Sequence, residues 1–146
     1  MTAEDNKDIA RRFLEAGASG DVETIVALLA EDVTWWVPRP FGERIASVAG
    51  VQFPASGIVS GRDAVLSEFV GPIQALFVPG AHRVRIDDMV AEGDKVVVLM
   101  HIDGEVATGG EYHNDFSLFF EIRNGQIASV REYLDTLYVI ETVSGG

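Results

Sequence analysis

The 146-residue sequence contains no cysteine, which excludes disulfides, thiolate metal sites and cysteine nucleophiles. It is also poor in positive charge, because 11 Lys and Arg residues stand against 23 Asp and Glu residues and give a net charge of −12. The basic residues are scattered, and a protein of this charge repels phosphate backbones and anionic lipid surfaces. We therefore expect neither nucleic acid nor a membrane surface as a partner.

Long apolar runs are missing too, although 47% of the residues are apolar. No run approaches the roughly 18 residues that a membrane-spanning helix needs. Residues 1–5 are polar and acidic and lack the basic start and apolar block of a secretory signal. These features predict a cytoplasmic location. The length predicts one domain with room for a core and a cavity.

The first part of the chain predicts two short amphipathic helices and a strand. Residues 2–18 open with the capping signal Thr2-x-x-Asp5 and carry apolar residues along one side. Asp21 is a good N-cap for a second helix that should stop near residue 30. Residues 33–37 are rich in β-branched and aromatic side chains, which predicts a short strand ended by Pro38.

Residues 38–61 are expected to form a long loop, because prolines and glycines interrupt them. The segment is nevertheless apolar, with Phe41, Ile45 and Phe53 among its side chains. This composition argues against disorder. The segment is expected to act either as a lid over a pocket or as a small second core.

A third helix and four strands are predicted in the rest of the chain. The helix should cover residues 61–77, with a bend at Gly71-Pro72. Strands at residues 82–90, 95–103, 112–122 and 127–135 should form an antiparallel meander. Asn124-Gly125 supplies the two positive-φ positions of a hairpin turn between the last two strands. Helices followed by strands predict an α+β fold.

Ionisable residues on these strands could form a site. Residues two apart share one face of a strand, so His101 and Asp103 are neighbours, and Glu132 shares a face with Leu134. If such a face encloses a pocket, desolvation raises the pKa of its carboxyl groups toward neutrality, and a nearby histidine can share the proton. That arrangement is suited to moving a proton on a carbonyl compound.

Each of these residues also has a purely structural interpretation. His101 is consistent with a half-exposed strand residue that makes one hydrogen bond. Asp103 is consistent with the start of a turn before Gly104, and Glu132 with a solvated ion pair beside Arg131. These alternatives stay open at the level of sequence.

The next strand and the histidines leave further questions open. On residues 112–122, His113 and Asp115 share one face, while Tyr112, Asn114 and Phe116 share the other; either set could line a pocket. The histidines, His82 included, fall on three different predicted strands and lack the short helical spacing of a zinc site. No metal site is therefore predicted.

Several segments, taken in order, resemble a known superfamily. They are Arg12-Phe13-Leu14, Gly20-Asp21-Val22 followed by Leu28-Leu29-Ala30-Glu31-Asp32-Val33, Gly61-Arg62-Asp63-Ala64-Val65, Asn124-Gly125-Gln126-Ile127 and Arg131-Glu132-Tyr133-Leu134-Asp135. Together they resemble the nuclear transport factor 2-like (NTF2-like) superfamily, and within it the SnoaL-like and ketosteroid isomerase-like proteins. The resemblance implies a single domain over residues 1–146, in which a curved antiparallel sheet wraps around three helices as a cone. It also implies a small hydrophobic ligand in the open end, and a homodimer.

A more distant resemblance is to limonene epoxide hydrolase. His101-Ile102-Asp103 resembles its Arg-x-Asp motif, with histidine in place of arginine, and Glu132 falls at its second aspartate. In that family, side chains of the first strand hold the nucleophilic water. This chain has Thr34 and Trp36 at the corresponding positions instead. Epoxide hydrolysis is therefore the nearest enzymatic alternative.

The resemblance and the residues together predict an acid–base enzyme that needs no cofactor. It would isomerise, cyclise or dehydrate a polyketide-, steroid- or terpenoid-like compound. Asp103 is the expected base, His101 its partner or an oxyanion donor, and Glu132 a second acid. The expected ligand-binding residues are Trp36, Phe53, Tyr112, Asn114 and Phe116. A non-catalytic ligand carrier is the alternative outside enzymes.

Overall fold

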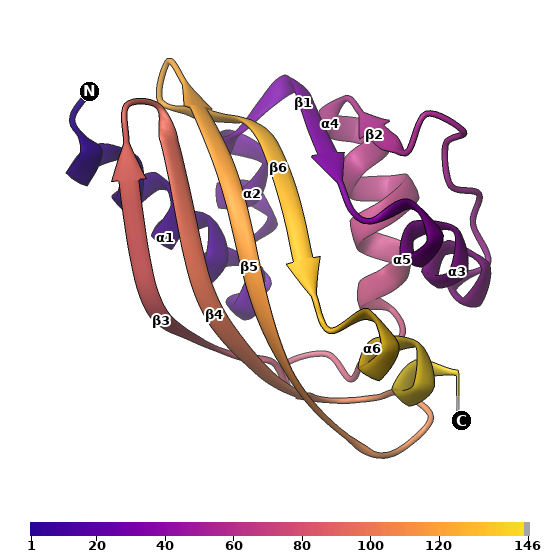
Figure 1. Ribbon diagram of the computed structural model, residues 1–146. Helices are drawn as coiled ribbons and strands as arrows, with labels where there is room; N and C mark the ends of the chain where they lie inside the picture. The colour runs from indigo at the N-terminus through magenta and orange to yellow at the C-terminus, as the bar shows by residue number, and fades with distance from the viewer. Residues whose placement is uncertain (145–146) are drawn as a thin grey trace.

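The computed structural model describes residues 1–144, which form one curved, open six-stranded sheet and a set of helices (Figure 1). The strand order is β2-β1-β6-β5-β4-β3. The strands are β1 Leu29–Trp36, β2 Ile58–Ser60, β3 Arg83–Glu92, β4 Lys95–Glu105, β5 Glu111–Arg123 and β6 Gln126–Leu134. All neighbouring strands are antiparallel except β1 and β6, which are parallel. The predicted α+β fold with a curved antiparallel sheet is confirmed.

Strands β3 to β6 form the predicted meander. Asn124 and Gly125 join β5 to β6 with φ angles of 52° and 76°, as the hairpin turn requires. The pairing shifts between Ile86 and Asp88 in β3, and again between Glu121 and Ile122 in β5. Such irregularities bend strands and increase their twist, so they help to curve the sheet around the helices.

The first two helices follow the prediction closely. Helix α1, Ala3–Ser19, begins with a capping box in which Thr2 and Asp5 each accept a backbone N–H of the other residue. Helix α2, Val22–Leu28, is capped by Asp21, whose side chain accepts the N–H of Thr24. Figure 1 shows both helices on the same face of the sheet. The apolar side of α1 is buried there, against β3 and β4.

Residues 38–61 do not form the predicted loop. Their first half is helix α3, Arg39–Ala49, and strand β2 follows and pairs with β1. Pro40 stands in the first turn, where proline costs no helical hydrogen bond, and Gly50 closes the helix in the left-handed conformation. The buried side chains Phe41 and Ile45 are four residues apart, which is helical spacing. The prolines therefore start this helix rather than prevent it.

The third predicted helix is present but irregular. It consists of α4 Arg62–Ala64, a π-helical turn at Val65–Val70 and α5 Gly71–Gln74. The N–H of Gly71 donates to the carbonyl of Leu66, five residues earlier, so the wide turn lies just before Pro72. No helix among residues 1–144 has both the length and the hydropathy to cross a membrane.

A further helix, α6 Thr136–Val143, was not predicted. Asp135 caps it by accepting the N–H of Tyr138. In Figure 1 it lies beyond the end of β6, beside α3, with which it is in contact. Helix α6 also contacts β5.

Candidate functional site

A cavity of about 350 Å³ lies between the inner face of the sheet and the helices. Its volume is at the lower end of the range typical of small-molecule sites. The walls are mainly apolar. The sheet contributes Met100, Phe116, Leu118 and Leu134, and the helices contribute Phe13, Phe41, Ile45, Phe69, Ile73 and Val139. A molecule in this cavity would meet mostly hydrocarbon.

Glu132 is the one carboxylate among the described residues that lines this cavity. It pairs with Leu118 across β5 and β6, and both point inward. Its Oε1 accepts a hydrogen bond of 3.1 Å from the indole Nε1–H of Trp35 on β1. Burial raises the pKa of Glu132 to about 7, and the Trp35 hydrogen bond only partly opposes this. At neutral pH this carboxyl group can therefore both give and take a proton.

Tyr112 and Asn114 form a second polar group at the cavity. Tyr112 lines the cavity, and its hydroxyl accepts a hydrogen bond of 2.9 Å from Nδ2 of Asn114. Asn114 is buried behind it and also donates to the carbonyl of Asp135 at 3.3 Å. Burial raises the pKa of Tyr112, and the negative charge of Glu132 raises it further. The tyrosine hydroxyl thus stays protonated and can donate to an oxygen of a ligand.

His82 also lines the cavity, just before β3. Its ring packs edge-on against Phe77, with 5.2 Å between ring centroids. Burial lowers the pKa of His82, so the imidazole is neutral at physiological pH. Nothing in the sequence pattern, beyond the residue type, had marked His82 as a cavity residue.

The structure places only some of the five predicted ligand-binding residues at the cavity. Tyr112 and Phe116 line the cavity, and Asn114 supports Tyr112 from behind. Trp36 instead lies on the outer face of the sheet, where the guanidinium of Arg131 is 4.0 Å from its ring centroid. Phe53 packs against α3 and the helical segment that follows β2, and it does not line the cavity.

The placement of Trp36 and Phe53 has simple causes. Adjacent residues of a strand face opposite sides, so Trp35, which lines the cavity, excludes Trp36 from it. The ring of Phe53 covers Gly42, whose missing side chain leaves room for it, and lies 5.9 Å from Phe69 between centroids. Prediction missed Trp35, although it alternates with the apolar residues Val33 and Val37.

His101 and Asp103 lie on the outer face of β4 and do not line the cavity, contrary to the expectation that they meet Glu132 there. The inward-pointing residues are instead Met100, which precedes His101, and Ile102, which lies between His101 and Asp103. Outside, Asp115 and Asp103 raise the pKa of His101 by accepting hydrogen bonds from its ring. The Arg-x-Asp-like motif is thus remote from the cavity.

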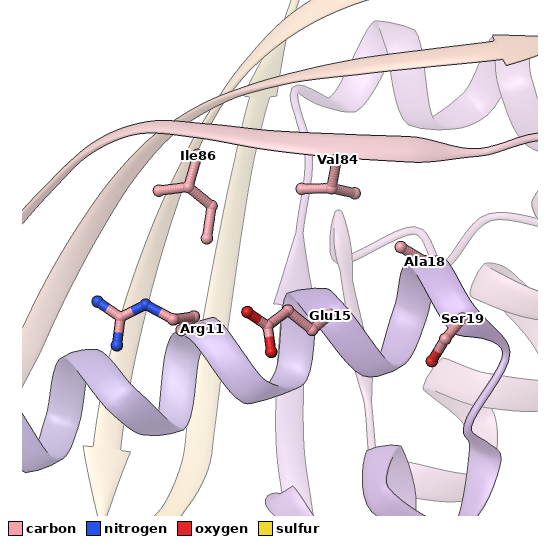
Figure 2. A pocket seen from close by; sticks show the side chains of 6 residues that line it. All are labelled: Arg11, Glu15, Ala18, Ser19, Val84 and Ile86. Carbon is pink, nitrogen blue, oxygen red and sulfur yellow. The ribbon is translucent and has the colours of Figure 1, made fainter.

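A second, more open hollow lies between α1 and β3 (Figure 2). Val84 and Ile86 point from β3 toward α1, and Arg11 and Glu15 lie along the helix below them. Neither charged group is buried, and Arg11 forms an ion pair with Asp8 at 3.6 Å. This hollow lacks the buried ionisable group, Glu132, that distinguishes the cavity between the sheet and the helices.

A comparison with known protein families identifies the family of this chain. A family model described as the SnoaL-like domain matches residues 10–130, which is most of the chain. The chain belongs to the SnoaL-like domain family. No match was found among curated proteins.

Solved structures of NTF2-like proteins share the fold of this SnoaL-like protein. One is an NTF2-like protein of unknown function from Burkholderia pseudomallei, 23% identical, with a TM-score of 0.79 and 99% of each chain covered. TerC, co-crystallised with polyporic acid, is 20% identical, with a TM-score of 0.78 and coverage of 96% of this chain and 98% of TerC. A protein from Jannaschia sp. assigned as a SnoaL-like polyketide cyclase is 16% identical, with a TM-score of 0.75 and coverage of 99% and 94%. These likenesses establish the NTF2-like fold.

The Trp35–Glu132 hydrogen bond leads to a first prediction. Trp35→Phe keeps an aromatic ring but removes the N–H that stabilises the ionised carboxylate. Hydrogen bonds to charged groups contribute about 1.5–3 kcal/mol, so the pKa of Glu132 should rise by roughly one unit or more. The pH dependence of the ¹³C carboxyl resonance of Glu132 measures this rise. An unchanged or lower midpoint would show that Trp35 does not stabilise the charged form.

Proposed function

We propose that the cavity binds a small hydrophobic carbonyl compound and that Glu132 moves a proton on it without a cofactor. The observation that carries this proposal is a carboxyl group with a pKa of about 7 in an apolar cavity. Acid–base catalysis is most efficient when the pKa of the catalytic group lies near the working pH. A carboxyl group in water, with its ordinary value of 4.5, would be a much weaker base.

The polar groups suggest a division of roles. Ionised Glu132 would take a proton from the carbon next to the carbonyl group, and the Tyr112 hydroxyl would donate to the oxygen on which negative charge develops. Trp35 would orient the carboxylate. Return of the proton at another carbon is isomerisation, attack of the carbanion on a second carbonyl is cyclisation, and loss of a β-hydroxyl group is dehydration.

The cavity and the structural neighbours support one substrate class. Hydrocarbon walls and a single carboxyl group favour a polyketide-, steroid- or terpenoid-like compound with few polar groups. One structural neighbour is assigned as a polyketide cyclase, and TerC was crystallised with polyporic acid. Asp103 and His101 have no role in this proposal, because they lie on the other face of the sheet.

Exchange of hydrogen for deuterium tests the proposal without knowledge of the natural substrate. Hydrophobic cyclic ketones and enones are incubated with the protein in D₂O, and NMR follows the protons next to the carbonyl group. We expect accelerated exchange for compounds that bind. Binding without any exchange would favour a ligand carrier. Entry of oxygen from labelled water into the product of an epoxide would favour hydrolysis instead.

We also propose that the protein forms a homodimer through the outer face of the sheet. Leu99 and Tyr133 on this face are 48% and 42% exposed, although they are large and apolar or aromatic. Leu99→Asp should then convert a dimer into a monomer. Light scattering coupled to gel filtration measures the mass, and a monomeric mass for the unmodified protein would contradict this arrangement.

A further inference from the structure

Two histidines and three carboxylates form a cluster on the outer face of the sheet, remote from the cavity. The register pairs Asp103 with His113 and His101 with Asp115 across β4 and β5. Glu111 lies two residues before His113, on the same face of β5. Two adjacent cross-strand pairs therefore each place an imidazole beside a carboxylate. We call these five residues the histidine cluster.

Two ring nitrogens of the histidine cluster converge on one oxygen. Nε2 of His101 lies 2.8 Å from Oδ1 of Asp103, and Nδ1 of His113 lies 2.6 Å from the same atom. The two rings are nearly parallel, at 11°, with their centroids 6.4 Å apart. The three ligand atoms lie within 4.8 Å of one another. Modest movements of these three side chains would let all three atoms contact one ion, since Zn–N bonds are about 2.0–2.1 Å long.

The opposite ring nitrogens are held by the other two carboxylates. Nδ1 of His101 lies 2.8 Å from Oδ1 of Asp115, and Nε2 of His113 lies 3.3 Å from Oε2 of Glu111. Histidines that bind metals usually donate their other N–H to a carboxylate in this way, which fixes the tautomer and makes the ligating nitrogen more basic. When Asp115 and Glu111 accept these N–H groups and the rings are neutral, the lone pairs of His101 Nε2 and His113 Nδ1 point toward Asp103.

Without an ion, protons on these two nitrogens can hold the arrangement together by donating to Asp103, and a divalent cation bound to the same three atoms would replace those protons. We propose that His101 Nε2, His113 Nδ1 and the Asp103 carboxylate bind a divalent transition-metal ion, with Zn²⁺ as the best fit. Two imidazoles, one carboxylate and a water molecule complete a tetrahedral zinc shell. Asp115 and Glu111 are positioning residues for the two histidines. The three carboxylates also give the site a net negative charge that favours a cation.

Titration calorimetry with ZnCl₂ on the tag-free full chain, near neutral pH and in a buffer that does not bind metal, tests the site. We expect one Zn²⁺ per chain. Asp115→Asn removes a residue that positions a ligand, and it should lower the Zn²⁺ affinity by roughly 10–100-fold. His113→Gln removes a ligand itself and should lower the affinity by more than that. His82→Gln is the matched control, because it removes the one other histidine and lies at the cavity. Its affinity should equal that of the unmodified protein.

A second readout separates a zinc site from a cluster held together by protons alone. Co²⁺ in place of Zn²⁺ should give the visible absorption of a tetrahedral ion, and this should be lost in His113→Gln but kept in His82→Gln. The absence of stoichiometric Zn²⁺ binding would overturn the proposal. So would unchanged affinity in His113→Gln, or an equal loss in His82→Gln.

Discussion

Replacing Glu132 by Gln should lower turnover by about 10²–10⁴-fold, the usual contribution of a positioned acid–base group. Glutamine has nearly the same shape and can still accept the hydrogen bond from Trp35, so the cavity should keep its form. Ligand affinity should therefore change by only a small factor. Deuterium exchange into a bound ketone measures the first effect, and a direct binding titration measures the second.

Glu121→Gln is the matched control for this experiment. Glu121 is a half-buried carboxylate of β5, the strand that pairs with β6, and it does not line the cavity. Turnover in this variant should equal that of the unmodified protein. Full activity in Glu132→Gln, or a loss found in Asp103→Asn in its place, would move the chemistry away from the cavity.

Glu132→Gln should also stabilise the folded protein above neutral pH. Glu132 has a pKa of about 7 in the folded protein against an ordinary value of 4.5, so folding favours its protonated form. That stabilisation is fully present below pH 4.5 and is lost as the pH rises through 7. The interval corresponds to roughly 3 kcal/mol, at 1.36 kcal/mol per pH unit. Glutamine carries no charge and does not incur this loss.

Urea unfolding at two pH values measures the effect on stability. At about pH 8, Glu132→Gln should have a free energy of unfolding higher than that of the unmodified protein by on the order of 3 kcal/mol. Near pH 4.5 the two proteins should differ little. Equal stability of Glu132→Gln and the unmodified protein at both pH values would mean that Glu132 is well solvated. A gain in stability with a loss of activity is typical of catalytic residues.

The elements with strong local signals could be predicted from the sequence. The capping box of Thr2 and Asp5 fixes the start of α1, and Asn124-Gly125 fixes the β5–β6 turn because few residues accept positive φ. Alternation along β6 correctly placed Glu132 and Leu134 on one face. Local rules sufficed here because the stabilising contacts are between near neighbours in sequence.

The errors arose where the answer depends on contacts between distant segments. Alternation shows that His101 and Asp103 share a face, but not whether that face meets the helices or the outside. Met100 and Ile102 are more apolar and take the inner side. In the same way, Pro38 and Pro40 suggested a loop, whereas the burial of Phe41 and Ile45 favours α3. Tertiary packing overrides local propensity in both cases.

The most direct test of the central claim is the pKa of Glu132, measured from its ¹³C carboxyl resonance as the pH is varied. Sequestration in an apolar cavity predicts a midpoint of about 7. A midpoint near 4.5, the ordinary value for a glutamate, would contradict the account, because the carboxylate would then be in contact with bulk water.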